Sequence, residues 1–447
     1  MKEVINLETT QKARSHSTIA ALLSGVWMGL GQLYNRQYLK GLFFILSELY
    51  LMLFWIPTLR HAMWGLITLG EQTQKRVGFD TIAGDHSIYL MIEGFIGLIA
   101  IGIILFVYVM NVRDAYKVGK KRELGIEPNN LKQTYKNIIE NGFAYLLLSP
   151  SILFVLFLVL LPNIFSIAIG FTNYSAPNHI PPKNLVDWVG FDSFISLFQL
   201  ATWKDTFIGV FGWTVLWGIL ATVTTFFSGL FFAVILNQKG IRLKKFWRSI
   251  FILPWAVPQF VSILIFRNMF NGQFGPINQF LMDLGVISSN IPWLSDPLMS
   301  KITLVLVNMW FGFPFWMVLM SGVMTSIDKE LYEAADVDGA NAKQKFFKIT
   351  LPIVLFSTAP LLIMQFAFNF NNFNVIYLLT EGGPANPDYI YAGHTDILIS
   401  WIYKLTLDQS QFAMASVVSI LIFIVVATIS VWNFRRTKAF KEEDMMS

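Results

Sequence analysis

Long apolar stretches are the feature of this sequence that most restricts its fold. Each holds the roughly 20 predominantly apolar residues that a helix needs to cross the hydrocarbon layer of a membrane. Backbone polar groups in lipid must also be satisfied internally, which a helix achieves within one segment. The sequence therefore predicts an all-α polytopic membrane protein with about eight transmembrane helices. The eight stretches are residues 41–59, 88–111, 143–172, 207–237, 249–270, 302–325, 353–378 and 412–434.

The composition supports a membrane protein. Of the 447 residues, 55% are hydrophobic and only 14% are charged, whereas soluble domains expose more charge. Cysteine is absent, which excludes disulfides, thiolate metal sites and a cysteine nucleophile. The first residues, MKEVINLETTQKARSHS, lack the apolar core and small-residue cleavage site of a signal peptide, so we expect no cleavable leader.

A ninth candidate, residues 18–34, is shorter than the other apolar stretches. It contains Gly25, Trp27, Gly29 and Gly31, residue types that favour bends or the membrane interface. We therefore predict an interfacial or re-entrant helix, with a full span as the alternative.

The distribution of Lys and Arg predicts the orientation. With both termini inside, the segments assigned to the cytoplasm hold 25 of the 33 Lys and Arg residues, in agreement with the positive-inside rule. The stretch NQKGIRLKKFWR at 237–248 is the strongest single marker of the inner face. We expect a multi-pass protein of the cell membrane with both termini and residues 328–350 in the cytoplasm.

Motifs of enzyme chemistry are missing from the sequence. It contains no GxxxxGK[ST] phosphate loop, no HExxH pair, no GxSxG elbow and no acidic metal cluster, and its five histidines are scattered. We therefore expect no catalytic residue, no metal and no cofactor. If this protein moves a substrate, the energy must come from elsewhere.

One polar segment, LYEAADVDGANAKQKFFKITLP at 331–352, interrupts the apolar runs. Asp328 can cap a short helix, and Gly339 can end it in the left-handed conformation that most residues avoid. The small side chains of Ala334 and Ala335 would let a partner approach closely, as in a helix that sits in a groove. The alternative is a linker that happens to be helical.

The spacing E-A-A, three residues, G, nine residues, I-x-L-P resembles the EAA loop of permease subunits of binding-protein-dependent ABC importers. In that family the loop is a coupling helix that docks on a separate ATPase subunit. The resemblance implies the type I importer permease fold, with ATP bound by partner subunits rather than by this chain. The matching positions are Glu333, Ala334, Ala335, Gly339, Ile349, Leu351 and Pro352.

The resemblance covers roughly residues 140–447 and is strongest to maltose/maltodextrin permeases of the Gram-positive type. Segments such as ILPWAVPQFVSILIFRNMFN and FAFNFNNFNVIYLLTEGGP carry it, and no large domain is inserted after the third span. We divide the chain into an amino-terminal region, 1–140, and an importer core, 141–447, with the coupling loop at 328–350. The implied partners are a second homologous permease subunit, two ATPase subunits and an extracellular sugar-binding lipoprotein, with membrane lipid and no nucleic acid.

Amides and aromatic rings recur together in spans five to seven. Buried amides are costly unless they find partners or line a wet cavity. Neutral amides beside rings suit an uncharged oligosaccharide, whereas a charged substrate would require buried Arg or carboxylates. The alternative is that the amides hold helices together. Asn369 and Asn372 lie three residues apart, which predicts one shared helix face.

The family's pocket, carried over position by position, implies eight substrate-binding residues. Phe315 departs from the family's tyrosine at its position and lacks that hydroxyl. The eight are Trp255, Asn308, Trp310, Gly312, Phe315, Phe368, Asn369 and Asn372.

The sequence thus predicts the pore-lining permease subunit of an ATP-driven importer of maltodextrin or maltose-type oligosaccharides. Another oligosaccharide, such as raffinose, is an alternative, and glycerol phosphate would require cations where only Arg267 lies near. A proton-driven secondary carrier would need titratable groups in the core spans, but the acidic residues within spans, Glu48 and Glu93, fall in the first two. A polytopic glycosyltransferase would need an acidic motif in a loop.

Overall fold

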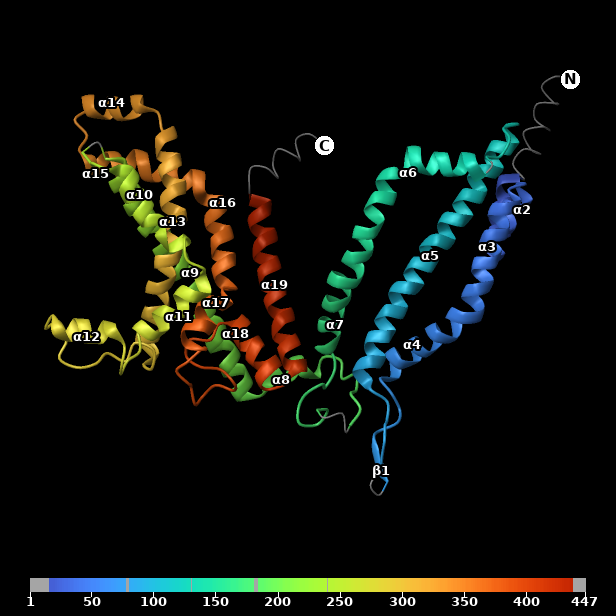
Figure 1. The fold of residues 1–447 in the computed structure, drawn as a ribbon, viewed down its shortest axis with the longest axis horizontal. Helices are drawn as coiled ribbons and strands as arrows, with labels where there is room; N and C mark the ends of the chain where they lie inside the picture. Colours follow the sequence, from blue (N-terminus) through green and yellow to red (C-terminus); the bar gives the residue numbers. More distant parts are fainter. Residues whose placement is uncertain (1–15, 78–79, 130, 181–183, 239, 437–447) are drawn as a thin grey trace. The chain divides into compact units, whose positions relative to one another are not determined.

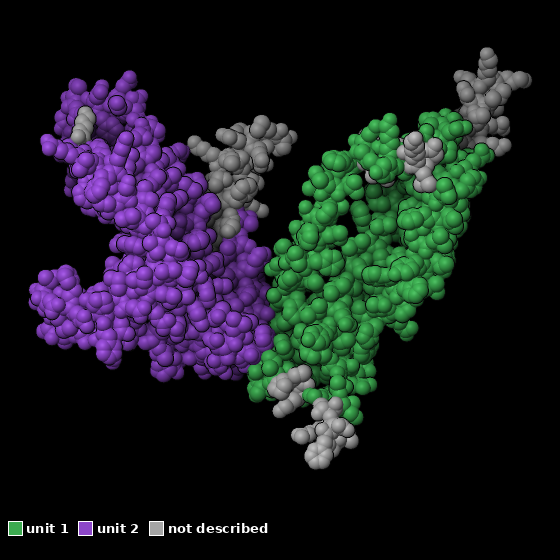
Figure 2. Space-filling model, viewed as in Figure 1, with its two compact units in different colours: residues 1–190 green, residues 191–447 purple. Residues whose placement is uncertain are grey.

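The computed structural model describes residues 16–77, 80–129, 131–180, 184–238 and 240–436. The chain forms two compact units, Met1–Gly190 and Phe191–Ser447, which Figure 2 shows in different colours. The predicted boundary at residue 140 falls inside a helix of the first unit. The predicted division into an amino-terminal region and an importer core concerns function rather than compactness, so it stays a prediction.

The first unit consists of long apolar helices and a small hairpin. Its helices α4 and α5 pack closely, since a side chain at Gly65 or Gly94 would overlap Leu90 or Leu66 on the other helix. Its elements are α2 (Leu30–Tyr34), α3 (Tyr38–Tyr50), the π-helical η1 (Leu51–Trp55), α4 (Ile56–Thr68), β1 (Lys75–Val77), β2 (Asp80–Ile82), α5 (Ser87–Glu123), α6 (Leu131–Phe154), the π-helical η2 (Val155–Leu160) and α7 (Leu161–Ile169).

The segment predicted to be re-entrant is a short helix followed by a turn. The helix His16–Val26 is about 16 Å long, which is too short to cross the hydrocarbon layer. The chain then turns at Gly29, whose φ of 94° is easy only for glycine, and α2 follows. The buried carboxylate of Glu48 accepts a hydrogen bond from the Met28 amide and holds this turn against α3. Within the described residues, 18–34 is thus a helix, a turn and a second short helix rather than one continuous helix, which agrees with the interfacial or re-entrant interpretation.

The second unit is built around α9 (Ala201–Asn237), which packs against both α13 (Pro297–Ser326) and α16 (Leu351–Phe370). Small residues on α9 permit the approach: a Cβ at Gly229 would overlap Trp316. The other elements are α8 (Asp192–Gln199), α10 (Lys244–Ile252), η3 (Leu253–Trp255), α11 (Gln259–Met269), α12 (Pro276–Asp283), α14 (Lys329–Val337), α15 (Ala342–Lys345), η4 (Phe346–Thr350), α17 (Phe373–Thr380), α18 (Leu398–Tyr403), η5 (Lys404–Asp408) and α19 (Phe412–Arg436), as Figure 1 shows.

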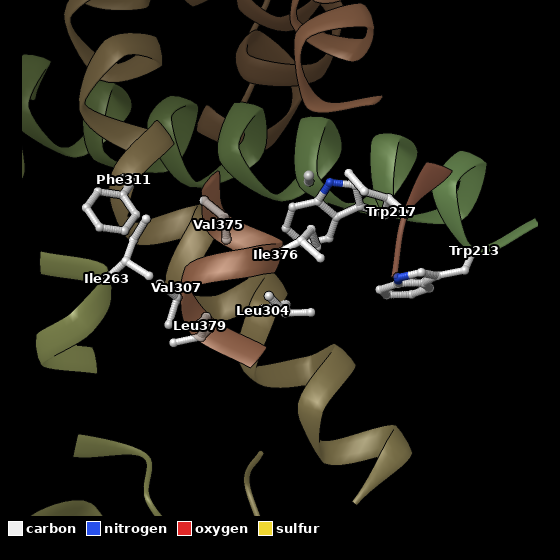
Figure 3. Packing of buried hydrophobic residues seen from close by; sticks show 11 residues of the cluster. Trp213, Trp217, Ile263, Leu304, Val307, Phe311, Val375, Ile376 and Leu379 are labelled. Atoms are coloured by element: carbon white, nitrogen blue, oxygen red, sulfur yellow. The ribbon is translucent and has the colours of Figure 1, made fainter. Parts of the chain in front are cut away.

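An apolar cluster joins four of these helices. Trp217 of α9 is fully buried and lies near Leu304 of α13 and Ile376 of α17, while Ile263 enters from α11 (Figure 3). Indole N–H groups in a core require acceptors, and Trp217 donates to the backbone oxygen of Asn369 at 3.0 Å. The cluster therefore fixes the ends of the helices that carry the amides of spans six and seven.

Among the described residues, six helices are long and apolar enough to cross a membrane. The stretch predicted at 249–270 is instead a pair of helices bent by 87°, which could form a seventh span. The stretch predicted at 412–434 contains a shorter apolar helix, Phe412–Thr428. The polytopic, predominantly helical fold is confirmed, whereas the count of eight spans is not. The antiparallel hairpin of β1 and β2 is a small departure from an all-α chain.

Because the sequence contains no cysteine, orientation can be tested with single introduced thiols. Leu243 and Ala385 are exposed and lie on opposite sides of the predicted topology. We expect Leu243→Cys to react with a membrane-impermeant maleimide only after permeabilisation, and Ala385→Cys to react on intact cells. The opposite labelling pattern would refute the predicted orientation.

Candidate functional site

The fifth apolar stretch bends where two prolines interrupt it. Pro254 and Pro258 lack the amide hydrogen that a continuous helix uses, so α10 ends in the 3₁₀ turn η3 and α11 starts afresh at Gln259. Irregular backbone at membrane depth is tolerated where it faces protein or a cavity. Trp255 lies at this bend with 52% of its surface exposed, so its ring is available at the break.

The seventh stretch is also interrupted, between α16 and α17. Asn372 is the residue before α17, and its Oδ1 accepts a hydrogen bond from the amide of Val375 at 3.4 Å. The prediction that Asn369 and Asn372 share one helix face was therefore wrong. An Asn side chain can either sit within a helix or bind a nearby backbone amide and start a new helix. Here Asn372 starts a new helix.

The three predicted asparagines are buried and bound to other helices. Asn372 donates its Nδ2 to Oδ1 of Asn308 on α13 at 3.2 Å, and both side chains are buried. Asn369 donates to Oγ1 of Thr222 on α9 at 3.0 Å. Gln365 reaches the Asn369 oxygen at 3.4 Å. These contacts pair each amide with a partner, as the alternative of interhelical bonding requires.

The sequence analysis did not predict Thr222, because it sought pocket residues in spans five to seven and Thr222 lies in span four. Four threonines on α9 are buried, and the hydroxyl groups of three of them, Thr206, Thr214 and Thr222, accept hydrogen bonds from other segments. Thr206 accepts from the Ile390 amide at 2.9 Å and Thr214 from the Leu398 amide at 3.0 Å. Eight residues turn an α-helix by about 80° beyond two full turns, so Thr206, Thr214 and Thr222 follow a spiral around α9 rather than a single face. Hydroxyl groups within an otherwise apolar span were the sequence signal for these residues.

The aromatic members of the predicted pocket lie at the surface of the second unit. The rings of Trp255 and Phe315 are 6.4 Å apart at an angle of 38°. Phe315 is 38% and Phe368 64% exposed, whereas Trp310 is partly buried and packs edge-to-face on Phe266 at 5.0 Å. The predicted residues therefore divide into exposed rings and buried amides.

Gly312 has a packing role in this structure. A Cβ at this position would lie 2.9 Å from Cβ of Thr225 and still closer to its methyl group, so glycine is what permits α13 to approach α9. The sequence predicted Gly312 as a pocket residue, and the structure places it at a helix–helix contact.

Two cations of the second unit have partners. Arg267, the cation that an anionic substrate would need, forms an ion pair with Glu381 at 2.8 Å. Lys301 lies over the ring of Trp213 at 4.6 Å. Among the described residues, no group of three or more His, Cys, Asp or Glu could hold a metal ion.

The segment from 328 to 352 is folded much as the sequence predicts. Asp328 caps α14 by accepting from the Glu330 amide at 3.0 Å, and Gly339 follows the helix with a φ of 74°. Asn341 and Gln344 form a capping box that starts α15, an N-x-x-Q signal that the sequence analysis did not use. The π-helical η4 then leads into α16, with Leu351 and Pro352 in its first turn.

The outer face of this segment is largely exposed. Leu331 and Val337 are exposed, and so are Glu333 and Ala334, while Ala335 and Ile349 are partly exposed. Lys345 pairs with Asp336 at 2.5 Å, which ties α15 to α14. A cavity of about 630 Å³ lies behind α14 and is lined by Tyr332 and Phe346 among others. The segment thus presents a stiff helix pair with apolar side chains in water.

The loop 381–397 contains a buried ion pair that the sequence did not reveal. Asp396 is fully buried and accepts from Lys404 Nζ at 2.6 Å, Ser400 Oγ at 2.7 Å and the Gly393 amide at 2.7 Å. Burial raises the pKa of the Asp396 carboxyl, and the ammonium of Lys404 opposes that rise. A single Asp among apolar neighbours gives no sequence signal for this arrangement.

Gly312→Ala tests the close approach of α13 to α9. Because the added methyl overlaps Thr225, we expect a loss of about 1–3 kcal/mol in the free energy of unfolding, visible as a lower Tm of the purified protein. Gly322→Ala is the matched control, because nothing lies within 4 Å of its added Cβ on the same helix. Equal Tm values for the two variants would contradict the packing role.

Comparison with known proteins agrees with this geometry. Residues 226–439 match the family model described as "Binding-protein-dependent transport system inner membrane component". The Galactooligosaccharides transport system permease protein GanP of Bacillus subtilis is 43% identical over 96% of this chain and 99% of its own length. The Maltodextrin transport system permease protein MalC of Streptococcus pneumoniae is 40% identical, with 99% of each chain covered.

A solved structure supports the fold alone. A bacterial ABC transporter that imports the acidic polysaccharide alginate has a TM-score of 0.53 and 23% identity, covering 67% of this chain and 96% of that one. Its similarity confirms the predicted importer permease fold. On the strength of relatives at 40–43% identity along nearly the whole length, this multi-pass membrane protein belongs to the family of inner membrane components of binding-protein-dependent transport systems, and it is close in sequence to maltodextrin and galactooligosaccharide permeases.

Proposed function

We propose that this chain is the pore-lining permease subunit of an ATP-driven importer for neutral oligosaccharides of the maltodextrin type. It acts with a second homologous permease subunit, two ATPase subunits and an extracellular sugar-binding lipoprotein. ATP is bound by the partner subunits, and this chain carries out no covalent chemistry. Both termini and the 328–350 loop lie in the cytoplasm.

One observation carries the choice of a neutral sugar: exposed rings lie beside breaks in two spans, and Arg267, in the last turn of α11, is already paired. The rings of Trp255, Phe315 and Phe368 offer flat apolar faces for the C–H surface of a sugar. Arg267 is neutralised by Glu381, so it does not provide an anion site. This arrangement favours neutral oligosaccharides over glycerol phosphate.

In this proposal the buried amides bind the sugar when the spans rearrange. Asn308 and Asn372 face each other across α13 and the start of α17, and Asn369 ends α16. Substrate hydroxyls can replace these amide–amide and amide–hydroxyl bonds at little cost, because each lost bond is exchanged for a similar one. Trp310 and Gly312 then shape the wall of the path rather than contact the sugar first.

The helix pair at 328–350 supplies the proposed coupling. Glu333, Ala334, Ala335 and Gly339 form its first half, and Ile349, Leu351 and Pro352 join it to α16. Because α15, η4 and α16 follow one another without interruption from Ala342 to Phe370, movement of the loop would reach the break at Asn372. ATP-driven closure of the ATPase pair would thus act on the sugar path.

A second candidate substrate is a galactooligosaccharide, because the relative at 43% identity is named for it. Uptake by the reconstituted importer separates the two: labelled maltotriose transport should be inhibited strongly by unlabelled maltodextrins and weakly by galactooligosaccharides. The reverse order would assign the galactooligosaccharide. Inhibition by an anionic sugar alone would refute the neutral pocket.

Asn369→Leu and Asn372→Leu test the amides in the sugar path. We expect transport per assembled complex to fall roughly tenfold or more, since hydrogen bonds with sugar hydroxyls are lost at about 0.5–1.5 kcal/mol each and a hydroxyl left unpaired costs more. Uptake and the yield of purified complex are measured together. Asn371→Leu is the control, because that exposed side chain contacts only the Ala367 carbonyl of its own helix. If uptake falls only in proportion to the yield of purified complex, Asn369 and Asn372 have a structural role and do not bind the sugar.

Trp255→Ala and Phe368→Ala test the rings separately. Both side chains are exposed in the second unit, so assembly should be unchanged while the apparent affinity for sugar weakens about two- to tenfold. The concentration dependence of uptake gives this value. Unchanged affinity in both variants would remove the rings from the path.

Gly339→Val tests coupling. Nothing lies near a Cβ at this position, so the change acts through the backbone, where a β-branched residue at φ 74° is strained by about 1–2 kcal/mol. We expect sugar-loaded binding protein to lose its stimulation of ATP hydrolysis. Gly339→Asn, which tolerates this conformation, should retain it. Normal stimulation in the valine variant would contradict the proposal.

A further inference from the structure

A second candidate site lies in the first unit, where the first membrane span begins. A cavity of about 230 Å³ is formed by Arg36, Gln37 and Lys40 on one side and Asn129 and Thr134 on the other. This is room for several water molecules. Tyr38 is the first residue of the span Tyr38–Thr68, so the cavity lies at the level of the lipid headgroups.

The cavity combines an uncapped helix start with two cations. No side chain caps α3, so the amides of its first turn at Tyr38, Leu39 and Lys40 lack helical acceptors. Helix starts normally favour acidic residues, yet Arg36 and Lys40 stand here and no acidic residue lines the described cavity. Positive charge added to a positive helix end is unfavourable unless an anion binds there.

Arg36 is the free cation of this pair. Lys40 is joined to Asp114 at 2.7 Å, whereas Arg36 takes part in none of the ion pairs between described residues. Arg36 is exposed and has a φ of 62°, a conformation that non-glycine residues adopt rarely. Arg36 therefore departs from the usual pattern in two ways: it is a cation at the start of a helix, and it is a non-glycine residue with a positive φ. Such departures are typical of a functional position.

Gln37 is a second, independent pointer to a ligand. It lines the cavity, is only 7% exposed, and donates its Nε2 to the Asn129 carbonyl at 3.0 Å. Its Oε1 is buried without a hydrogen-bond partner among the described residues. A buried acceptor without a donor is costly, so a ligand that brings a hydroxyl group fits this position.

The rim of the cavity is apolar. Tyr38 and Leu39 are each 66% exposed, and Leu42 and Phe43 continue the same exposed surface along α3. Soluble phosphate would gain nothing from such a rim, whereas the acyl chains of a lipid would cover it. The cavity therefore suits a ligand that combines an anionic group, a hydroxyl donor and an apolar tail in one molecule.

We propose that this cavity binds the headgroup of an anionic phospholipid of the phosphatidylglycerol type. The phosphate lies against Arg36 and the first amides of α3, and a glycerol hydroxyl donates to Gln37 Oε1. The site is independent of the sugar path, because all its residues belong to the first unit. Bound lipid would tie the re-entrant segment before Asn35 to the membrane surface.

The test uses the assembled importer, purified in detergent and stripped of lipid. Dioleoyl-phosphatidylglycerol, the matching phosphatidic acid, phosphatidylcholine and inorganic phosphate are added in turn, and binding is followed by native mass spectrometry and by Tm. We expect phosphatidylglycerol to bind most tightly, phosphatidic acid less tightly because it lacks the glycerol hydroxyls, and phosphatidylcholine and inorganic phosphate to have no effect.

Arg36→Asn is the deciding variant, because asparagine tolerates the positive φ and removes only the charge. We expect about tenfold weaker phosphatidylglycerol binding, as for the loss of a hydrogen bond to a charged group. Lys120→Gln is the control: Lys120 is an exposed cation of the same unit that does not line the cavity. Equal binding by the two variants would overturn the proposal.

One measurement on the unmodified complex and one conservative variant keep the proposal falsifiable if Arg36→Asn fails to assemble. Binding should weaken as salt rises from 0.05 to about 0.5 M, because exposed charges are screened. Arg36→Lys, which retains the charge, should keep most of the affinity. Salt-independent binding, equal retention of phosphatidylcholine, or equal stabilisation by inorganic phosphate would each refute a phosphatidylglycerol site.

Discussion

The need to satisfy polar groups away from water is the constraint on which the rest of this structure depends. Lipid offers no hydrogen bonds, so an interruption in a span is stable only where side chains or neighbouring helices replace what the helix loses. The break before α17 meets this condition, since Asn372 caps α17 and binds Asn308. Trp217 satisfies the Asn369 carbonyl at the end of α16. The positions of the breaks, and hence of the proposed sugar path, follow from these bonds.

The sequence predicted the features that depend on local patterns. Apolar length identified the spans, and the turn chemistry of Asp328 and Gly339 identified the helix pair, because caps and left-handed turns act within a few residues. Pro254 and Pro258 indicated that the fifth stretch is interrupted, but they did not indicate the size of the bend. The helix break at Asn372 was missed, because whether an asparagine continues or caps a helix depends on partners such as Asn308, far away in the sequence.

Long-range pairing explains what else could not be predicted at the candidate site. The role of Gly312 is visible only once Thr225 is known to face it, and the burial of Asp396 depends on a loop closed by Lys404 and Gly393. The family's pocket implied both rings and amides, yet it could not separate exposed rings from buried amides. That division comes from tertiary packing, which places the rings of Trp255 and Phe368 outside and Asn369 inside.

The division between rings and amides suggests how one chain can hold a sugar path closed without an energetic penalty for the amides. In this structure Asn372 binds Asn308 and Asn369 binds Thr222, so each of these buried amides has a partner. In the proposed mechanism, sugar hydroxyls take over those bonds when the path opens. That exchange would be nearly neutral in free energy, so the direction of transport would be left to the proposed ATPase acting through the helix that starts at Ala342. A pocket lined by unpaired charges could not close in this way, because an uncompensated buried charge is far more costly than a buried amide.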